Sequence, residues 1–486
     1  MNDSDFEFEV VVVGGGPAGL AAACVAAESG SSVGVLDDTP WLGGQIWRGQ
    51  ESPVHARHGP NVWHVASPSP PLEERAGESR RSPFPSASAG QLSNPQARYW
   101  LTRFHNSGAT LLRGTSVVAA PRLGLLLAER NQRPCQIRWR RLILATGARE
   151  LFLPFPGWTL PGVLGAGGLL SLAKHGWPVS NRRIIVAGSG PLLLAAAEGL
   201  RRHGAHVPLI AEQAPWPQVM GFGAALMTHG KLLQAIQLKL RLLGVPYRCG
   251  TWPVRTDGDD QLRNVTLTDG RRTWREACDL LACGFGLVPN VELPLALGCE
   301  LRDGFVGVDS RQTTSVPDVY CAGEPTGIAG ADSALVQGLV AGYAASGQVS
   351  KGEALFAERD AWHRFRDALA RAFALRPELR SLAADETLLC RCEDVTLGQV
   401  RQFSNWRDAK LQSRCGMGAC QGRVCGAAAK VILGWEMESV RPPVLPALVG
   451  SLLSQPRAEP PPADSHTEKE HRIAPVDNAP QLCTGL

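Results

Sequence analysis

The sequence predicts an α/β protein with two dinucleotide-binding units and a small cysteine-rich module near its C-terminus. Residues 9–38 and 182–213 each read as a strand, a glycine turn, a helix and a second strand that ends near an acidic residue. A third segment, residues 390–425, holds five of the chain's 13 cysteines. Because 486 residues exceed what one compact core holds, roughly two to four domains are expected.

The composition narrows the classes of function. The chain is 44% hydrophobic and 19% charged with a formal net charge of +4, as in an ordinary globular protein. It has no long basic block, so neither nucleic acid nor an anionic membrane is favoured as a partner. No apolar run reaches the roughly 18 residues of a membrane span, and the N-terminus lacks an export-signal pattern. We therefore expect a cytoplasmic location, where thiols stay reduced and serve metal ligation or redox chemistry.

The first unit carries the pattern of a dinucleotide-binding turn. Gly14, Gly16 and Gly19 stand in GxGxxG spacing. Gly14 allows the tight turn, Gly16 lets the backbone approach a pyrophosphate, and Gly19 lets the helix pack on the strand. The phosphates would bind at the helix N-terminus. Asp37, 23 residues after Gly14, is placed to accept a hydrogen bond from a ribose hydroxyl.

Later segments complete this unit. Residues 49–97 are rich in Ser, Pro and charge, and we interpret them as a flexible insertion. Order returns before RLILATGARE, a strand that ends at the turn Ala145–Thr146–Gly147. Residues 318–342 read as a strand, a glycine-rich turn and a helix starting near Ala331. The positive end of that helix would face a flat ligand and favour its anionic reduced form.

The second unit departs from the pattern at one position. Gly188 and Gly190 are kept, but Leu193 replaces the third glycine. Glu212 ends the next strand, and a glutamate there suits the free 2′-hydroxyl of NAD and repels the 2′-phosphate of NADP. Leu193 would push the helix away from the strand and so close or reshape the pyrophosphate site. NAD binding, a vestigial fold and a site for another nucleotide all stay open at this point.

The chain resembles the flavin-binding larger subunit of heteromeric amine and amino-acid dehydrogenases in the motifs GGGPAG, GGQIW, LILATGARE, LPFPGWTLPGV, AGSGPLLLA, AGEPTGIAG and CRCEDVT…CGMGACQGRVC. That group includes opine oxidases, hydroxyproline and proline dehydrogenases, and hydrogen cyanide synthase. The resemblance covers roughly residues 8–48 and 98–445. It implies a flavoprotein fold with two Rossmann-like, FAD/NAD(P)-binding domains and a small C-terminal helical iron–sulfur domain.

The resemblance places FAD in the first unit. Gly14, Gly16 and Gly19 would cradle its pyrophosphate, and Asp37 would bind its adenosine ribose. Glu324 stands where related flavoproteins have Asp beside the ribityl chain. The other cofactor contacts implied are Gly44, Gln45, Ala145, Thr146, Gly147 and Gly323, with Gly188, Gly190 and Glu212 for a nucleotide in the second unit.

A division of labour is also implied by the resemblance. A smaller partner subunit carries its own flavin and takes the hydride of an amino acid, imino acid or opine. The larger subunit receives the electrons and passes them on, so no catalytic residue is assigned to this chain. A third small subunit, an FMN at a subunit interface and NAD in the second unit are compatible additions.

The C-terminal segment resembles bacterioferritin-associated ferredoxin, a [2Fe–2S] module with a CxC pair and a later CxxC pair. This chain departs from the second pair, because four residues separate Cys415 from Cys420. Cys390 and Cys392 match the first pair. The resemblance gives Cys415 and Cys420 as the second pair, with Cys425 as a rival for the last ligand. Four thiolates suit such a cluster, although structural zinc also takes four cysteines and unligated reactive thiols are a third interpretation. CxC is tighter than the usual zinc knuckle, which favours iron–sulfur.

A capping box at Thr396 and Gln399 predicts a helix just after the first cysteine pair. The domains that we expect are the FAD-binding domain at 1–180 and 293–355, a second dinucleotide-type domain at 181–292, a linker helix and iron–sulfur domain at 356–450, and a disordered tail at 451–486.

The function that we expect is electron relay in a dye- or quinone-linked dehydrogenase acting on CH–NH or CH–NH2 donors. A flavin beside an iron–sulfur cluster would link a two-electron carrier to a one-electron carrier. The alternatives are a self-sufficient NADH-dependent flavoprotein reductase and a non-catalytic flavin scaffold that docks a partner.

Overall fold

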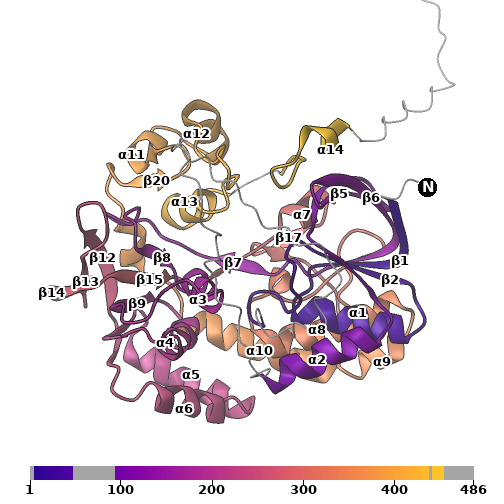
Figure 1. The fold of residues 1–486 in the computed structure, drawn as a ribbon, viewed down its shortest axis with the longest axis horizontal. Coiled ribbons are helices and arrows are strands. Elements are labelled where there is room, and N and C mark those ends of the chain that lie inside the picture. The colour runs from indigo at the N-terminus through magenta and orange to yellow at the C-terminus, as the bar shows by residue number, and fades with distance from the viewer. Residues whose placement is uncertain (1–4, 48–93, 437–439, 454–486) are drawn as a thin grey trace, which may run out of the picture.

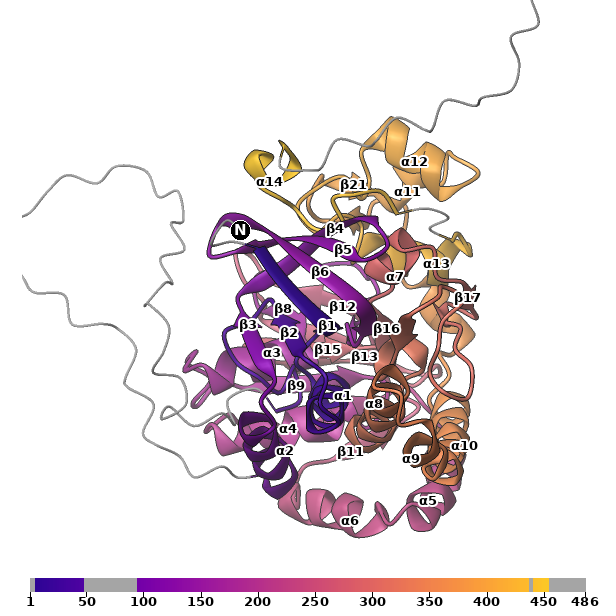
Figure 2. The same cartoon turned by 90° about the vertical axis from the view of Figure 1, so that its right-hand side faces the viewer.

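The computed structural model contains two largely parallel sheets side by side, with the cysteine-rich module above them (Figure 1). The same arrangement seen from the side places helices α1, α2 and α8 on the face of the first sheet away from that module (Figure 2). The structure describes residues 5–47, 94–436 and 440–453.

Two expectations fall largely outside the described residues. They are the flexible insertion at 49–97 and the disordered tail at 451–486. Within the first range, helix α2 (Pro95–Asn106) begins directly after Asn94, whose side chain accepts hydrogen bonds from the N–H groups of the first helical turn. Within the second, helix α14 (Val449–Leu453) ends at the last described residue.

The first sheet has seven strands in the order β3-β2-β1-β6-β5-β4, with β19 paired to β6. They are β1 (Asp5–Val13), β2 (Val33–Asp37), β3 (Thr110–Arg113), β4 (Thr115–Arg122), β5 (Leu125–Arg130), β6 (Arg133–Leu144) and β19 (Val319–Cys321). Strands β1, β2, β6 and β19 are parallel and end together, since Val13 pairs with both Leu36 and Leu144, and Cys321 pairs with Leu144. Ligands of open parallel sheets bind beyond such a carboxyl edge.

Helices α1 (Pro17–Glu28) and α8 (Ala331–Ala345) pack against each other through small residues. A Cβ at Gly338 would lie 2.1 Å from the carbonyl oxygen of Ala18, and one at Gly342 would lie 2.5 Å from that of Ala22. The two backbones therefore touch without intervening side chains. This contact returns the segment after β19 to the first glycine turn.

The second sheet has five parallel strands in the order β11-β10-β9-β15-β8. They are β8 (Val163–Gly165), β9 (Ile184–Gly188), β10 (Ile210–Glu212), β11 (Tyr247–Cys249) and β15 (Leu280–Gly284). Its helices are α3 (Ala166–Lys174), α4 (Leu192–Arg202), α5 (Trp216–Thr228) and α6 (Leu232–Arg241). An antiparallel sheet adjoins it, made of β12 (Trp252–Asp257), β13 (Asn264–Thr268) and β14 (Thr273–Ala277).

Short elements join the two parts. An antiparallel pair, β7 (Ala148–Glu150) and β16 (Leu287–Pro289), runs between the sheets. Helix α10 (Phe356–Ala372) lies beneath both sheets in Figure 1 and leads to the cysteine module. The remaining short elements are α7 (Glu292–Ala296), β17 (Leu301–Arg302), β18 (Phe305–Val306), η1 (Glu324–Thr326), α9 (Val349–Glu353) and η2 (Pro377–Ser381).

The cysteine module consists of β20 (Leu388–Cys390), β21 (Val395–Thr396), α11 (Leu397–Val400), α12 (Trp406–Ser413) and α13 (Cys425–Leu433). The predicted capping box is confirmed: Thr396 Oγ1 accepts from the N–H of Gln399, and Gln399 Oε1 accepts from the N–H of Thr396. Trp158 Nε1 donates to the Leu388 carbonyl over 2.7 Å, which attaches the module to the second part of the chain.

The structure also bears on membrane spans. Within the ranges that the structure describes, no helix combines the length and the apolar character that crossing a bilayer requires.

We expect Gly338→Ala to destabilise the protein by about 1–3 kcal/mol, because the added methyl group meets backbone that cannot move aside. Gly221→Ala is the matched control, since a Cβ there has no neighbour within 4 Å. It should stabilise α5 by about 0.5–1 kcal/mol through helix propensity. Denaturant unfolding measures both variants. Equal effects would contradict the backbone contact between α1 and α8.

Candidate dinucleotide site and cysteine centre

The first glycine turn is shaped by backbone contacts that exclude side chains. Gly14 has φ +105°, and a Cβ there would lie 2.2 Å from the Ala145 carbonyl oxygen. A Cβ at Gly19 would lie 1.9 Å from the carbonyl oxygen of Gly14. At Gly16 the nearest atom to a Cβ is the Gly44 Cα at 3.9 Å, and no side chain caps the helix that starts here. The first N–H groups of α1 thus remain available to a phosphate.

Asp37 fixes the turn and lines the adjoining cavity. Its Oδ2 accepts from the Gly15 N–H over 2.6 Å, and its Oδ1 accepts from both the N–H and the Oγ1 of Thr39. The side chain is nearly buried, with 8% exposed. A carboxylate offers about four acceptor positions, so Asp37 retains capacity for a ribose hydroxyl.

A cavity of about 180 Å³ opens at this edge of the first sheet. Gly14, Asp37 and Thr146 contribute to its wall from the first unit. Arg423 and Val444, from the C-terminal part of the chain, line the same cavity. The glycine cradle, the acid at the strand end and the cavity fit the phosphate and ribose of a dinucleotide.

The remaining predicted contacts surround the same edge. Gly44 packs on Gly16, where a Cβ on Gly44 would lie 3.0 Å from the Gly16 Cα, whereas Gln45 is exposed. Gly323 has φ +85° and donates its N–H to Gln337 Oε1 over 2.8 Å.

Glu324 lies beside Gly147, its carboxylate oxygen 3.9 Å from the position of a Cβ there. Burial raises the pKa of Glu324, and a hydrogen bond from the Ala148 backbone partly opposes the rise. The structure therefore places an acidic side chain with a raised pKa at the turn that follows β6.

The acid of the second unit is turned inward. Glu212 is fully buried, and its carboxylate accepts from the N–H groups of Gly190 over 2.8 Å and Ala214 over 2.9 Å. Burial raises the pKa of Glu212 to about 7, although both backbone hydrogen bonds lower it. The Tyr247 hydroxyl lies 3.4 Å from the same carboxylate. The carboxylate thus serves the turn itself and has no exposed surface.

The chain's own linker lies on this second turn. Ser189 Oγ donates to the Phe373 carbonyl over 3.2 Å, and Gln213 Nε2 donates to the Ala374 carbonyl over 3.1 Å. Gln213 Oε1 in turn accepts from the Arg376 N–H, and the Arg376 guanidinium stacks 3.8 Å above the Trp252 ring. Residues 373–376 therefore bridge the glycine turn and the residue after Glu212.

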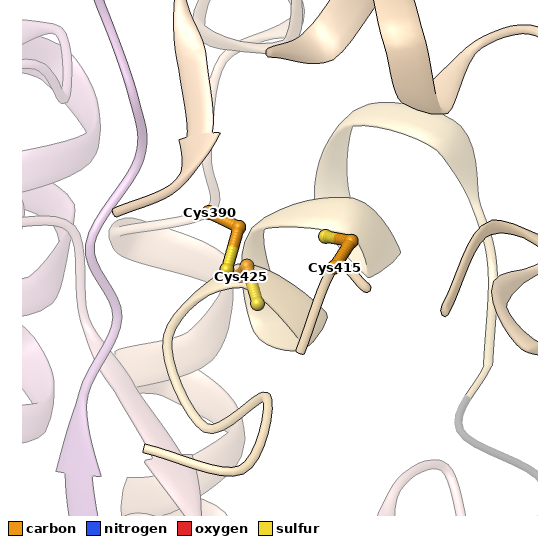
Figure 3. A group of neighbouring side chains, drawn as sticks. All are labelled: Cys390, Cys415 and Cys425. Atoms are coloured by element: carbon orange, nitrogen blue, oxygen red, sulfur yellow. The ribbon is translucent and has the colours of Figure 1, made fainter. Parts of the chain in front are cut away.

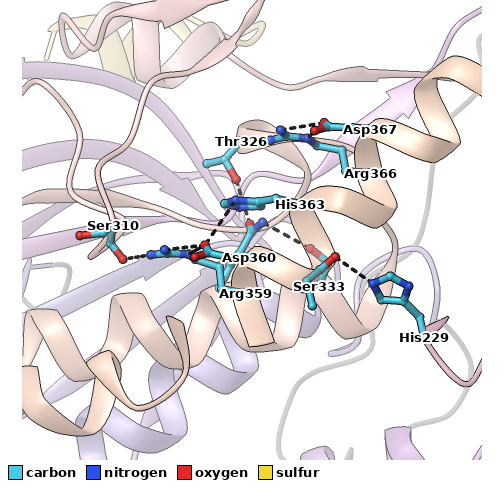
Figure 4. Close-up of polar contacts among 11 residues, drawn as sticks. His229, Ser310, Thr326, Ser333, Arg359, Asp360, His363, Arg366 and Asp367 are labelled. Atoms are coloured by element: carbon cyan, nitrogen blue, oxygen red, sulfur yellow. Dashed lines mark hydrogen bonds and ion pairs between the residues drawn. The ribbon is translucent and has the colours of Figure 1, made fainter. Parts of the chain in front are cut away.

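A cluster of aromatic side chains extends from this linker toward the first unit. Phe222 of α5 contacts both Phe365 and Phe373, with ring centroids 5.4 Å apart in each pair. Trp362 joins them and packs near Ala329, just before α8. Figure 4 shows polar side chains along α10, where Asp360 lies beside Arg359 and His363. Helix α10 thus fills the space between α5 and the first turn of α8.

Three cysteine thiols of the C-terminal module converge. The Sγ atoms of Cys390, Cys415 and Cys425 lie within 4.8 Å of one another, and all three residues are buried (Figure 3). Cys420 lies beside this group, because the thiols of Cys425 and Cys392 both lower its pKa. The Cys425 thiol is the main cause of the lowering of the Cys420 pKa to about 4, which favours the thiolate that binds metal. The donor set fits an iron–sulfur centre.

The structure brings together a different subset of thiols than the sequence emphasised. Cys390 and Cys415 of the predicted set are joined by Cys425, the rival ligand, which is the first residue of α13. Cys392 is exposed and Cys420 half-buried at the edge of the group. The other described cysteines are free thiols, and Cys283 and Cys321 lie in the core as expected.

Two arginines near the site were missed by sequence reasoning. Arg149 donates to the Asn290 Oδ1 over 2.7 Å and to the Arg423 carbonyl over 3.1 Å. It also pairs with Glu292 at 3.0 Å, while burial lowers its pKa. The available signal was their position, because Arg149 follows the Gly147 turn and Arg423 stands between Cys420 and Cys425.

The comparisons with known proteins agree with this geometry. Residues 8–338 match the pyridine nucleotide-disulphide oxidoreductase family. Hydrogen cyanide synthase subunit HcnB of Pseudomonas aeruginosa is 30% identical over 85% of this chain and 90% of its own length. An opine oxidase subunit of Rhizobium meliloti is 30% identical over 92% of this chain and 98% of its own.

Among solved structures, L-proline dehydrogenase from P. horikoshii has a TM-score of 0.63 at 17% identity, over 92% of this chain and 80% of that chain. This likeness concerns the fold alone. The predicted flavoprotein fold class is confirmed, and the family implies FAD as a cofactor. The chain belongs to the pyridine nucleotide-disulphide oxidoreductase family, in the branch that holds hydrogen cyanide synthase subunit HcnB and the opine oxidase subunit.

Proposed function

We propose that this chain is the electron-relay subunit of a heteromeric dehydrogenase whose substrate is oxidised on another subunit. One observation carries the proposal. The segment that gathers the thiols also supplies Arg423 to the wall of the first dinucleotide cavity. A dinucleotide cavity that shares a wall with a cysteine centre suits an electron carrier.

The two cofactors proposed are FAD in the first unit and a [2Fe–2S] cluster on the thiols, which exchange two electrons and one electron respectively. The chain's own residues bind and orient them. The turn at Gly14 and the start of α1 hold the pyrophosphate, and Asp37 holds the ribose while it fixes the turn. The ligand set proposed for the cluster is Cys390, Cys392, Cys415 and Cys420.

The proposed partner is a smaller flavin-containing subunit that oxidises an amino acid, imino acid or opine at a CH–NH or CH–NH2 group. The names of the relatives support a partner, since both are subunits. Large apolar side chains that remain exposed along α5 and α6 support it too, because such surfaces mark protein interaction sites. They are Trp216, Met220, Met227, Leu233, Ile236 and Leu240.

Further components of the proposal are a third small subunit, an FMN at the subunit interface and a dye or quinone as the electron acceptor. The free thiols of the described cysteines favour the cytoplasm as the place of work, because disulfides form in oxidising compartments.

The alternative function, an NADH-dependent reductase, requires an accessible second site. The contacts of residues 373–376 with Ser189 and Gln213 count against it, since they cover the glycine turn. The inward Glu212 counts against it as well, because a ribose would need that carboxylate at the surface. We therefore propose that the second unit holds the linker and takes no part in the electron supply.

Dye reduction by the chain alone and by the chain co-purified with the products of neighbouring genes tests this division of labour. We expect the complex to reduce dye with an amino-acid or opine donor and the lone chain to show under about a hundredth of that rate. NADH should bleach the flavin of neither sample under anaerobic conditions. Full activity of the lone chain, or rapid bleaching by NADH, would contradict the proposal.

Single Cys→Ser variants at the five positions test the cysteine centre. A [2Fe–2S] cluster needs four thiolates. We therefore expect four variants to lose most of the bound iron and acid-labile sulfide, and Cys425→Ser to keep them. Cys299→Ser is the control, because Cys299 is also buried but lies outside the cysteine-rich segment. Retention of iron by Cys420→Ser, with loss of iron from Cys425→Ser, would exchange Cys420 for Cys425 as the last ligand, and stoichiometric zinc in the wild-type chain would overturn the cluster.

A further inference from the structure

Arg423 belongs to the cysteine module but faces the first dinucleotide cavity. It stands between Cys420 and Cys425 in the segment CQGRVC. Arg423 lines the cavity together with Gly14 and Thr146. Among the residues that line this cavity, Arg423 is the single basic one, whereas Asp37, Asp38 and Glu292 are acidic there. A cation from a distant part of the chain has therefore been brought to the glycine turn.

The guanidinium of Arg423 is held by neutral groups. It donates to the Cys420 carbonyl over 3.4 Å and to the Val444 carbonyl. Within the described ranges, no carboxylate forms an ion pair with it. The neighbouring Arg149, by contrast, pairs with Glu292 at 3.0 Å. Since a guanidinium has five N–H donors, Arg423 keeps further donors and a full positive charge for another ligand.

We propose that Arg423 binds the phosphates of the dinucleotide in the first unit and so makes the cysteine module part of the cofactor site. The inference rests on the proposed function only in taking FAD as the dinucleotide. Arginine forms paired, charge-assisted hydrogen bonds with phosphate oxygens, which neutral N–H groups at a helix start cannot match in strength. The carbonyls of Cys420 and Val444 orient the guanidinium.

Hydrogen bonds also connect the backbone of Arg423 to the turn that contains Thr146. Thr146 Oγ1 donates to the Asn290 carbonyl over 2.7 Å, and Asn290 Nδ2 donates back to the Thr146 carbonyl over 2.8 Å. Arg149 links Asn290 to the Arg423 carbonyl. A phosphate bound to Arg423 would therefore be connected to the Thr146 turn and, through the Cys420 carbonyl, to the cysteine module. Binding of the dinucleotide would thereby be coupled to the position of the module.

Ligand affinity of the full chain after removal of its flavin tests the proposal without any assay of electron transfer. We expect Arg423→Met to weaken binding of FAD and of ADP by about tenfold or more, the size of a lost charge-assisted hydrogen bond. Adenosine, which has no phosphate, should bind both proteins equally. Arg423→Lys keeps the charge but loses the paired donors, so its affinities for FAD and ADP should fall between those of wild type and Arg423→Met.

Arg414→Met is the matched control, since Arg414 lies in the same module and its charge is paired with Glu393 at 2.8 Å. It should leave all three affinities unchanged. If Arg423→Met weakened adenosine as much as ADP, the effect would be structural and the proposal wrong. Unchanged ADP binding would overturn it as well. Either result would be visible even in a chain that relays no electrons, so the proposed function is judged separately.

Discussion

The attachment of the cysteine module to the first dinucleotide turn is the constraint on which the rest of this structure depends. Arg149 makes the attachment, because its side chain contacts Asn290 on one side and the Arg423 backbone on the other. The guanidinium is largely buried, and its ion pair with Glu292 offsets part of the cost of removing a charge from water. This contact holds the segment between Cys420 and Cys425 beside Asn290, whose side-chain amide donates to the carbonyl of Thr146 in the first unit.

The two dinucleotide-type units begin from similar sequences and reach opposite outcomes. In the first, Gly19 allows α1 to approach the strand, and the turn opens onto a cavity. In the second, Leu193 of α4 takes the place of the third glycine and is buried in the core. The linker at 373–376 lies on that turn, so the second unit supports the segment that leads to the cysteine module. The first unit thus offers a ligand site, whereas the second has a structural role.

Local patterns predicted much of this fold and part of the site. The glycine turns, the acids at strand ends and the Thr396–Gln399 capping box depend on residues close in sequence, so spacing alone reveals them. The cover of the second glycine turn by residues 373–376 could not be predicted from spacing, because Gln213 and Ala374, which share a hydrogen bond, are 161 positions apart. The grouping of Cys425 with Cys390 likewise depends on how α13 meets β20. The place of Arg423 at the cavity could not be predicted from its sequence neighbours, which are those of a cysteine-rich loop; the fold alone brings it there.

The most direct measurement of the relay is an anaerobic reductive titration of the purified full chain, followed by flavin absorbance and low-temperature EPR. We expect uptake of about three electrons per chain, with flavin bleaching and a [2Fe–2S] signal in the same titration. Uptake of about two electrons, with a bleached flavin and no cluster signal, would contradict the central claim that this chain joins the two carriers.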